Sequence, residues 1–233
     1  MLKYAITGKY EQIVQKLEDY CGESDCGYVK KPQSILSRFQ PAGTNAECFD
    51  CWLYLRDWKE RSSSGKNRID ILLHVQETIE RPGRLLLRST VHVNYYQING
   101  DKASLLQSVH FDYGQEDEDG QEQTAHPFFH AHITSEQMQL APEDAAELGF
   151  DRKLTNDEAR CLRDSRIPTS DMTFPSVLLC LAANHFAKDH FLGFRNELIE
   201  IQNQMPQPAF DAIRASLRAE SSHLRSSHWF AHF

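Results

Sequence analysis

The chain has 233 residues, of which 40% are hydrophobic and 25% are charged, and its formal net charge is −8. This composition can build a core without disulfides, which excludes a wholly disordered chain. The negative charge disfavours binding to a long stretch of phosphate backbone, because that affinity depends on many Lys and Arg contacts, but it allows a pocket for a single nucleotide.

Two further classes of protein are disfavoured by the sequence. No apolar run approaches the roughly 18 residues of a membrane helix, and the first 20 residues alternate apolar with charged side chains, unlike a signal peptide. We therefore expect a cytoplasmic protein with no membrane contact, whose cysteines are reduced. Cys21, Cys26, Cys48 and Cys51 have a spacing that could bind zinc, but a core role for the second pair is favoured by its aromatic surroundings.

The first half of the chain is predicted to contain one helix and then strands. Apolar residues at helical spacing predict a helix over residues 11–20, followed by a loop-like segment up to Ala46. Period-two alternation predicts a strand over 69–76, a turn at 81–84, and further strands over 85–96 and 105–113. Asn99 and Gly100 favour a tight hairpin turn between the last two strands, which should therefore pair antiparallel.

The second half adds one more strand and then helices. A strand is expected over 128–133, and helices over 156–163, 175–188 and 210–222, with Thr173 as the cap of the middle helix. This order predicts an α+β fold with a central antiparallel β-sheet, an N-terminal helix and C-terminal helices packed on one face. We expect one domain over residues 1–233, with the sheet core at about 67–135 and a helical part at about 155–233.

The main candidates for a functional site in the sequence are histidines on the predicted strands. His130 and His132 are two residues apart and share a face, to which a neighbouring strand can add His110, Asp112 or His92. Converging imidazoles and a carboxylate suit a divalent metal ion such as zinc or manganese, or a general acid and base. We therefore predict His110, Asp112, His130 and His132 as catalytic residues, with the three histidines as metal ligands; the alternative is a set of separate surface or core histidines.

Two other segments offer possible ligand-binding groups. Arg166 precedes Pro168 in a loop and could clamp a phosphate, although a plain connection between helices is the favoured interpretation. The acidic segment 116–120 lacks the first and last ligands of a calcium loop, so a solvated hairpin loop is favoured there.

The histidine stretch also carries a resemblance to a known family. The segment 84–132 combines a hairpin, a His-x-Asp strand and a His-Pro-x-x-His-x-His strand, and it resembles the TumE-like toxins of bacterial toxin–antitoxin systems. The resemblance implies a toxin or defence effector acting on RNA or a nucleotide, and it adds His126 to the site. Together with Arg166, His126 is our candidate for substrate binding.

Two functional hypotheses follow. The first is an effector that cuts nucleic acid or a nucleotide, as a nuclease or phosphodiesterase-type hydrolase would. The second is a non-enzymatic or antitoxin-like subunit that binds a protein partner of such a system, with structural histidines. Both include a protein partner, either a cognate antitoxin or another subunit of the complex.

Overall fold

The computed structural model describes residues 3–23, 28–29, 35–59, 68–80, 85–113, 129–134, 137–155 and 173–204. Helices and strands alternate little along the chain, as in other α+β folds. In chain order the elements are α1 (Lys3–Glu23), β1 (Tyr28–Val29), β2 (Ile35–Pro41), β3 (Ala46–Lys59), β4 (Arg68–Glu80), β5 (Leu85–Asn99), β6 (Lys102–Tyr113), β7 (Phe129–Thr134), α2 (Pro142–Leu148), β8 (Lys153–Thr155), α3 (Phe174–His185) and α4 (Lys188–Asn203).

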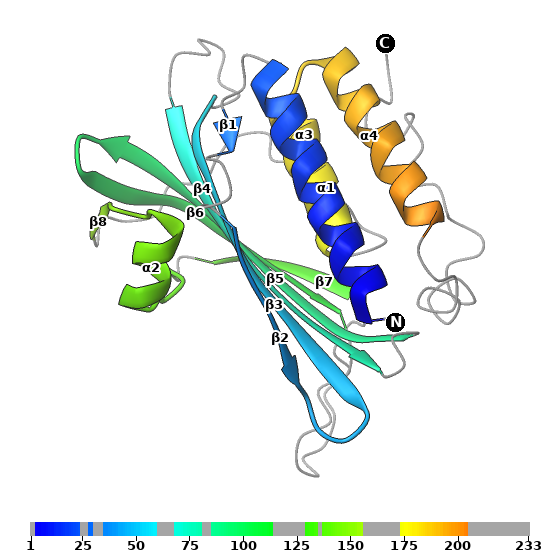
Figure 1. Cartoon of the computed structure of the whole chain (residues 1–233). Helices are drawn as coiled ribbons and strands as arrows, with labels where there is room; N and C mark the ends of the chain where they lie inside the picture. Colours follow the sequence, from blue (N-terminus) through cyan, green and yellow to red (C-terminus); the bar gives the residue numbers. More distant parts are fainter. Residues whose placement is uncertain are drawn as a thin grey trace.

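The strands form one eight-stranded sheet, which Figure 1 shows as a long, twisted surface. The strand order is β1-β3-β4-β5-β6-β7, while β2 also pairs with β3 and β8 with β6. The β6–β8 pairing is parallel, whereas the other pairings are antiparallel. The predicted hairpin turn is confirmed: Asn99 pairs with Lys102, and Gly100 has the positive φ of 65° that this tight turn requires.

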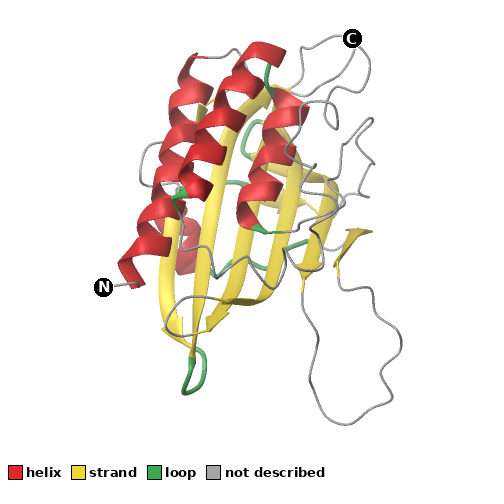
Figure 2. Ribbon diagram, turned by 90° about the vertical axis from the view of Figure 1, so that its right-hand side faces the viewer, coloured by secondary structure: helices red, strands yellow, loops and turns green. Residues whose placement is uncertain are grey.

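One face of the sheet is apolar and lies under α1, α3 and α4, as Figures 1 and 2 show. Leu73, Val93 and Val109 face one another across β4, β5 and β6, and all three are buried in the main core. Because side chains alternate along a strand, the residues between them point to the opposite face. The predicted fold class, with terminal helices packed on one face of an antiparallel sheet, is therefore confirmed.

The opposite face is covered at one end by α2 and the segment around it. Phe150 packs on Tyr54 and Tyr96, with ring centroids 5.1 Å and 5.9 Å apart. Leu148 is also fully buried in this second, smaller core. The remainder of this face carries polar side chains and is described below as the polar face.

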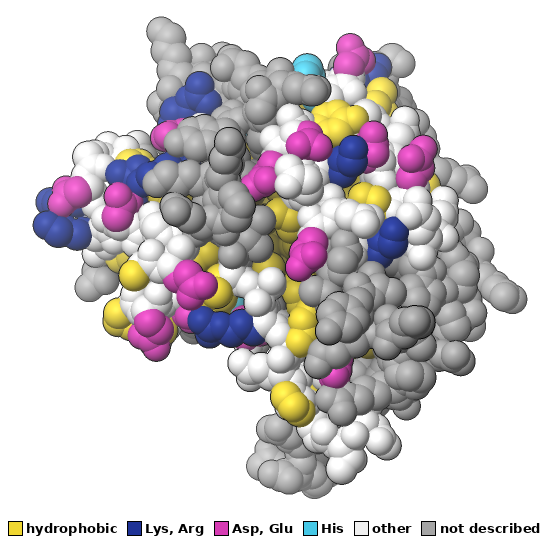
Figure 3. All heavy atoms as spheres, in the orientation of Figure 1, with side chains coloured by type: hydrophobic (Ala, Val, Ile, Leu, Met, Phe, Trp, Pro, Cys, Tyr) yellow, Lys and Arg dark blue, Asp and Glu magenta, His cyan; other side chains and the backbone are white. Residues whose placement is uncertain are grey.

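In the view of Figure 3, acidic and basic side chains of the described residues are interspersed over α1 and α4. Lys16 of α1 pairs with Glu197 of α4 at 3.4 Å. Among the described residues, no helix is long and apolar enough to span a membrane.

The prediction of a loop-like segment before Ala46 was wrong. Residues 35–41 form β2, which pairs in register with β3, and both precede the predicted sheet core. β3 itself was missed because residues 51–55 are buried on both faces, so the strand lacks the alternation of a half-buried strand.

The helical predictions succeeded only in part. α1 and α3 match the expected helices at 11–20 and 175–188, whereas α4 and the short α2 were not predicted. The expected helices at 156–163 and 210–222 and the turn at 81–84 lie outside the described residues.

The expected cap of α3 by the Thr173 side chain is not formed. Thr173 occupies the N-cap position, but its side chain makes no capping hydrogen bond. Instead, the Phe174 backbone N–H donates to the buried Glu77 carboxylate at 3.0 Å. A carboxylate at this position is stabilised by the partial positive charge of the helix N-terminus.

Candidate functional site

The candidate site is a row of aromatic residues that crosses the polar face at right angles to the strands. Trp52 lies opposite His74, His74 opposite His92, and His92 opposite His110. The backbone of His132 on β7 lies opposite His110 and occupies the next place. Residues directly opposite in antiparallel strands share a face, so five strands contribute to what we call the histidine row: Trp52, His74, His92, His110 and His132.

The described rings of the histidine row form two contacting pairs. His92 and His110 meet edge to face, with centroids 3.7 Å apart, and His74 stacks on Trp52 with centroids 3.8 Å apart and planes 7° from parallel. The row is half-buried, since the side chains of His74 and His110 are 18% and 29% exposed. It is therefore accessible to a ligand and yet shielded enough for strong electrostatic interactions.

Carboxylates flank the histidine row two residues further along the strands. Asp112 Oδ1 lies 2.9 Å from His110 Nε2 and accepts a hydrogen bond from Thr90 Oγ1 at 3.0 Å. On the other side of His92, toward β3, Asp50 Oδ1 lies 3.3 Å from His74 Nε2. His92 thus lies between two carboxylate–imidazole pairs.

The electrostatics of His92 differ from those of a surface histidine. Burial, and then the charges that His110 and His74 would add, lower the pKa of His92 to about 4. Its ring is therefore neutral at pH 7. Its buried Nε2 atom has no hydrogen-bond partner within the described part of the chain.

The Asp50 carboxyl is held in its charged form. Burial raises its pKa, but hydrogen bonds from His74 and Gln76 outweigh this effect, so the pKa is lowered overall. Gln76 Nε2 donates to Asp50 Oδ2 at 3.1 Å. The site therefore contains a carboxylate at one end and a neutral imidazole at its centre.

The predicted site residues are placed as follows. His110 and Asp112 are brought together as side chains, and the backbone register places His130 opposite Asp112 and His132 opposite His110. The side chains of His130 and His132 lie outside the described residues, as do His126 and Arg166. Their roles stay predictions.

Sequence reasoning missed several residues of the site. His74 and Gln76 lie on the polar side of the predicted strand 69–76, so the same alternation could have added them. Asp50 could not be placed, because β3 itself was not predicted. Thr90 was placed on the correct face, but its bond to Asp112 depends on the register between strands.

The described side chains do not form a metal site. Within the described part of the chain, no group of three or more His, Cys, Asp or Glu residues could hold a metal ion. Imidazoles that share one zinc ion bind through nitrogens about 2.0–2.1 Å from the metal, which keeps the ring centres well beyond 3.7 Å apart. As arranged here, His92 and His110 do not fit as ligands of one ion.

The two described cysteines of the possible zinc site, Cys48 and Cys51, do not come together either. Cys51 is buried in the main core, where burial raises the pKa of its thiol to about 12. Cys48 lies an odd number of residues away along β3, so it points to the other face. Two cysteines on opposite faces cannot bind the same ion.

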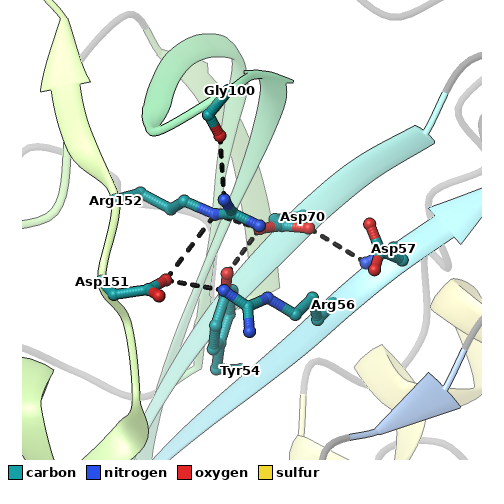
Figure 4. Close-up of polar contacts among 7 residues, drawn as sticks. All are labelled: Tyr54, Arg56, Asp57, Asp70, Gly100, Asp151 and Arg152. Carbon is teal, nitrogen blue, oxygen red and sulfur yellow. Dashed lines mark hydrogen bonds and ion pairs between the residues drawn. The ribbon is translucent and has the colours of Figure 1, made fainter.

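A second polar cluster lies on the same face, at the end covered by α2 (Figure 4). The fully buried Asp70 carboxylate accepts hydrogen bonds from the Tyr54 hydroxyl, from the Asp57 N–H at 3.0 Å and from Arg152 Nε at 3.4 Å. Asp57 lies at a β-bulge with a positive φ of 60°. Arg152 also donates to the Gly100 carbonyl at 2.9 Å.

The fold and the site define an α+β protein with a histidine row on the exposed part of its sheet. No family model matches the sequence, and comparison with curated proteins and with solved structures finds no significant similarity. The chemistry of the histidine row is therefore the basis for assigning a function.

Proposed function

We propose that the protein is a hydrolase that cleaves phosphodiester bonds of nucleic acid or a nucleotide by acid–base catalysis at the histidine row. The observation that carries this proposal is the alignment of His74, His92 and His110 on adjacent strands, with carboxylates beside the outer two. Such cleavage needs one group to accept a proton from the nucleophile and another to donate a proton to the leaving oxygen.

The site offers both roles. His92 is neutral and has a buried nitrogen without a partner, so it suits the acceptor of the proton. His110 lies 2.9 Å from Asp112, which can hold the imidazole in a fixed orientation, so it suits the donor of the proton. Thr90 fixes Asp112 in turn. His130 and His132 extend the same site in this proposal.

The alternative to acid–base catalysis at these imidazoles is a divalent metal ion with His110, His130 and His132 as its ligands, in which case His110 would not act as the proton donor. A zinc or manganese ion would supply Lewis-acid stabilisation of the phosphate oxygens when bound. The cellular role that we propose, by resemblance to the TumE-like toxins, is that of a toxin or defence effector with a protein partner.

The proposal is tested by growth and cleavage assays on matched histidine variants. His92→Asn and His110→Asn should relieve growth inhibition and lower the cleavage rate of single-stranded RNA by about 100- to 10,000-fold. The control is His190→Asn, because His190 lies on α4, across the sheet from the row.

The outcome that overturns the proposal is equal growth inhibition by the wild type and both row variants. That result would favour the non-enzymatic, partner-binding alternative. Circular dichroism of each variant distinguishes lost chemistry from lost folding.

A further inference from the structure

The ring of His74 lies between a carboxylate and an aromatic face. Its Nε2 atom is 3.3 Å from Asp50 Oδ1, and the ring stacks on Trp52 with centroids 3.8 Å apart and planes 7° from parallel. A positive charge on the imidazole would form an ion pair with the carboxylate and a cation–π interaction with the indole. The position of His74 therefore suits a ring that carries a proton on both nitrogens.

The Asp50 carboxylate is held in place for this contact. Gln76 Nε2 donates to its second oxygen at 3.1 Å, so both oxygens of Asp50 have a partner. Arg38 lies directly opposite Asp50 on β2 and pairs with Asp144 of α2 at 2.5 Å. In the described structure, the charged and titratable groups nearest His74 are therefore Asp50 on β3, Arg38 behind it on β2, and His92 on β5.

The second nitrogen of the His74 ring is available to a ligand. Nδ1 makes no hydrogen bond in the described structure, whereas Nε2 contacts Asp50. The side chain is 18% exposed, and Nδ1 is not one of the buried atoms that lack a partner, so solvent reaches it. A doubly protonated ring can donate to Asp50 through one nitrogen and to an anion through the other.

The proposed reaction needs a group of this kind. Cleavage of a phosphodiester develops negative charge on the phosphate oxygens, which donors fixed in the site must stabilise. In the proposed reaction His92 accepts a proton and His110 gives one to the leaving oxygen, so neither is assigned to these oxygens. His74 lies directly opposite His92, so a phosphate bound beside His92 lies within its reach.

We propose that His74 binds the phosphate of the bond to be cleaved through Nδ1, and that its ring takes up a proton from solvent when the phosphate binds. This inference rests on the proposed function. The charged ring then lies between two anionic groups, with Asp50 at one nitrogen and the phosphate at the other. Trp52 covers one face of the ring and excludes water there, which strengthens both contacts.

The inferred site takes a single phosphate, which agrees with the overall charge. One imidazolium matches the single charge of a phosphodiester. A chain with a net charge of −8 is not suited to neutralise a long run of phosphates. The smallest ligand that fits the site is therefore a dinucleotide, with one phosphodiester between two nucleosides.

The test is an NMR titration at pH 7.5 of the wild-type protein, labelled with ¹⁵N in its histidine rings, with a deoxydinucleotide. Histidine changes its charge between about pH 5 and 8, where a phosphodiester stays singly charged, so any proton taken up belongs to the protein. The His74 ring nitrogens, assigned through the carbons of the side chain, should move toward the imidazolium position as ligand is added. A dinucleotide with an uncharged methylphosphonate linkage is the control and should not produce this shift.

The affinity for the dinucleotide should depend on pH in the same way. Its Kd should decrease as the pH falls from 8 to 6, by at most about tenfold per pH unit, the limit for uptake of one proton. His74→Gln should make this dependence shallower and weaken binding at pH 6 about tenfold. Asp50→Asn, which removes the charge beside Nε2, should also make it shallower. His190→Gln, on α4 across the sheet, should change neither quantity.

The possible failures are separable. A His74 signal that does not move with the dinucleotide, or that moves equally with the methylphosphonate, overturns the inference even if the wild type cleaves RNA. An equal pH dependence of Kd in the wild type and His74→Gln also overturns it. Proton uptake at His74 without cleavage of RNA supports the inference and contradicts the hydrolase proposal. Absence of dinucleotide binding overturns the inference, while the growth and cleavage assays above decide the proposed function independently.

Discussion

Two polar clusters lie on the same face of β4, only four residues apart, and they are built in opposite ways. Asp70 is fully buried, and its carboxylate receives three hydrogen bonds from β3, the bulge and the α2 region. His74, in contrast, belongs to a half-exposed row in which the neighbouring His92 has a nitrogen without a partner in the described structure.

The difference separates a structural cluster from a functional one. A fully buried carboxylate that accepts hydrogen bonds from three elements joins them rigidly and is shielded from a ligand. An unsatisfied buried nitrogen costs free energy, so its presence requires another explanation, such as contact with a ligand. Arg56 Nε of the Asp70 cluster and Trp58 Nε1 also lack a partner in the described structure, so the criterion is the position of His92 between two carboxylate–imidazole pairs rather than the missing bond alone.

The largest effect on folding is expected at Asp70. Asp70→Ala leaves the Tyr54 hydroxyl and the Arg152 guanidinium without their buried acceptor, which should lower the free energy of unfolding by about 3–5 kcal/mol. Urea unfolding measures this loss. Asp101→Ala is the control, because Asp101 is exposed and pairs with Lys153 at the surface, so its loss should be far smaller than that of Asp70→Ala. Equal losses for the two variants would refute the structural role.

Stability should depend on pH through His92. The folded protein holds the pKa of His92 at about 4, whereas the unfolded chain has the ordinary value of about 6.5. Between these values the unfolded state binds the extra proton, so this contribution to stability is complete above pH 6.5 and is lost as the pH falls toward 4. Urea unfolding at several pH values measures this dependence.

His92→Leu removes the titrating group and provides the comparison. Between pH 6.5 and 4, its free energy of unfolding should fall less steeply with pH than that of the wild type. The difference between the two slopes should correspond to at most about one proton taken up on unfolding. At pH 7.5 the variant should be as stable as the wild type, because the row is not needed for folding. A parallel pH dependence in both proteins would contradict this account.

The smallest effect is expected at Thr90. Thr90→Val keeps the shape of the side chain but removes the hydrogen bond to Asp112, which should cost about 1 kcal/mol. The more specific readout is the ¹⁵N spectrum of the His110 ring, which should shift because Asp112 is less fixed. An unchanged His110 spectrum would show that Thr90 does not position the pair.

Local sequence patterns predicted the parts of the fold that are half-buried. The alternation over 85–96 and 105–113 gave the correct faces of β5 and β6, and Asn99 and Gly100 gave their pairing. β3 was missed because its centre is buried on both sides. α4 was missed although Phe191, Phe194 and Leu198 have helical spacing, because Gly193 interrupts a segment that also contains many polar residues.

For the candidate site, the sequence predicted only which side of its strand each residue lies on. The alternation put His92, His110 and Asp112 on the polar side of their strands, and the structure confirms this placement. Their alignment into a row depends on the register of each pair of strands, and a shift of one residue would turn a strand over. The partners of His74 depend on β3, which lies in a segment for which no strand was predicted.

The buried Glu77 carboxylate sets the order in which the chain can complete its fold. It accepts hydrogen bonds from Tyr10 on α1, from Ser89 on β5 and from the backbone of Phe174, which is 97 residues further along. At a synthesis rate of about 5–20 residues per second, roughly 5–20 s pass between the addition of Glu77 and that of Phe174. Until then, the closing of α1 over the sheet would bury a charge that still lacks the N-terminus of α3. The contact that joins α1, the sheet and α3 through Glu77 is therefore complete only after Phe174 has been added.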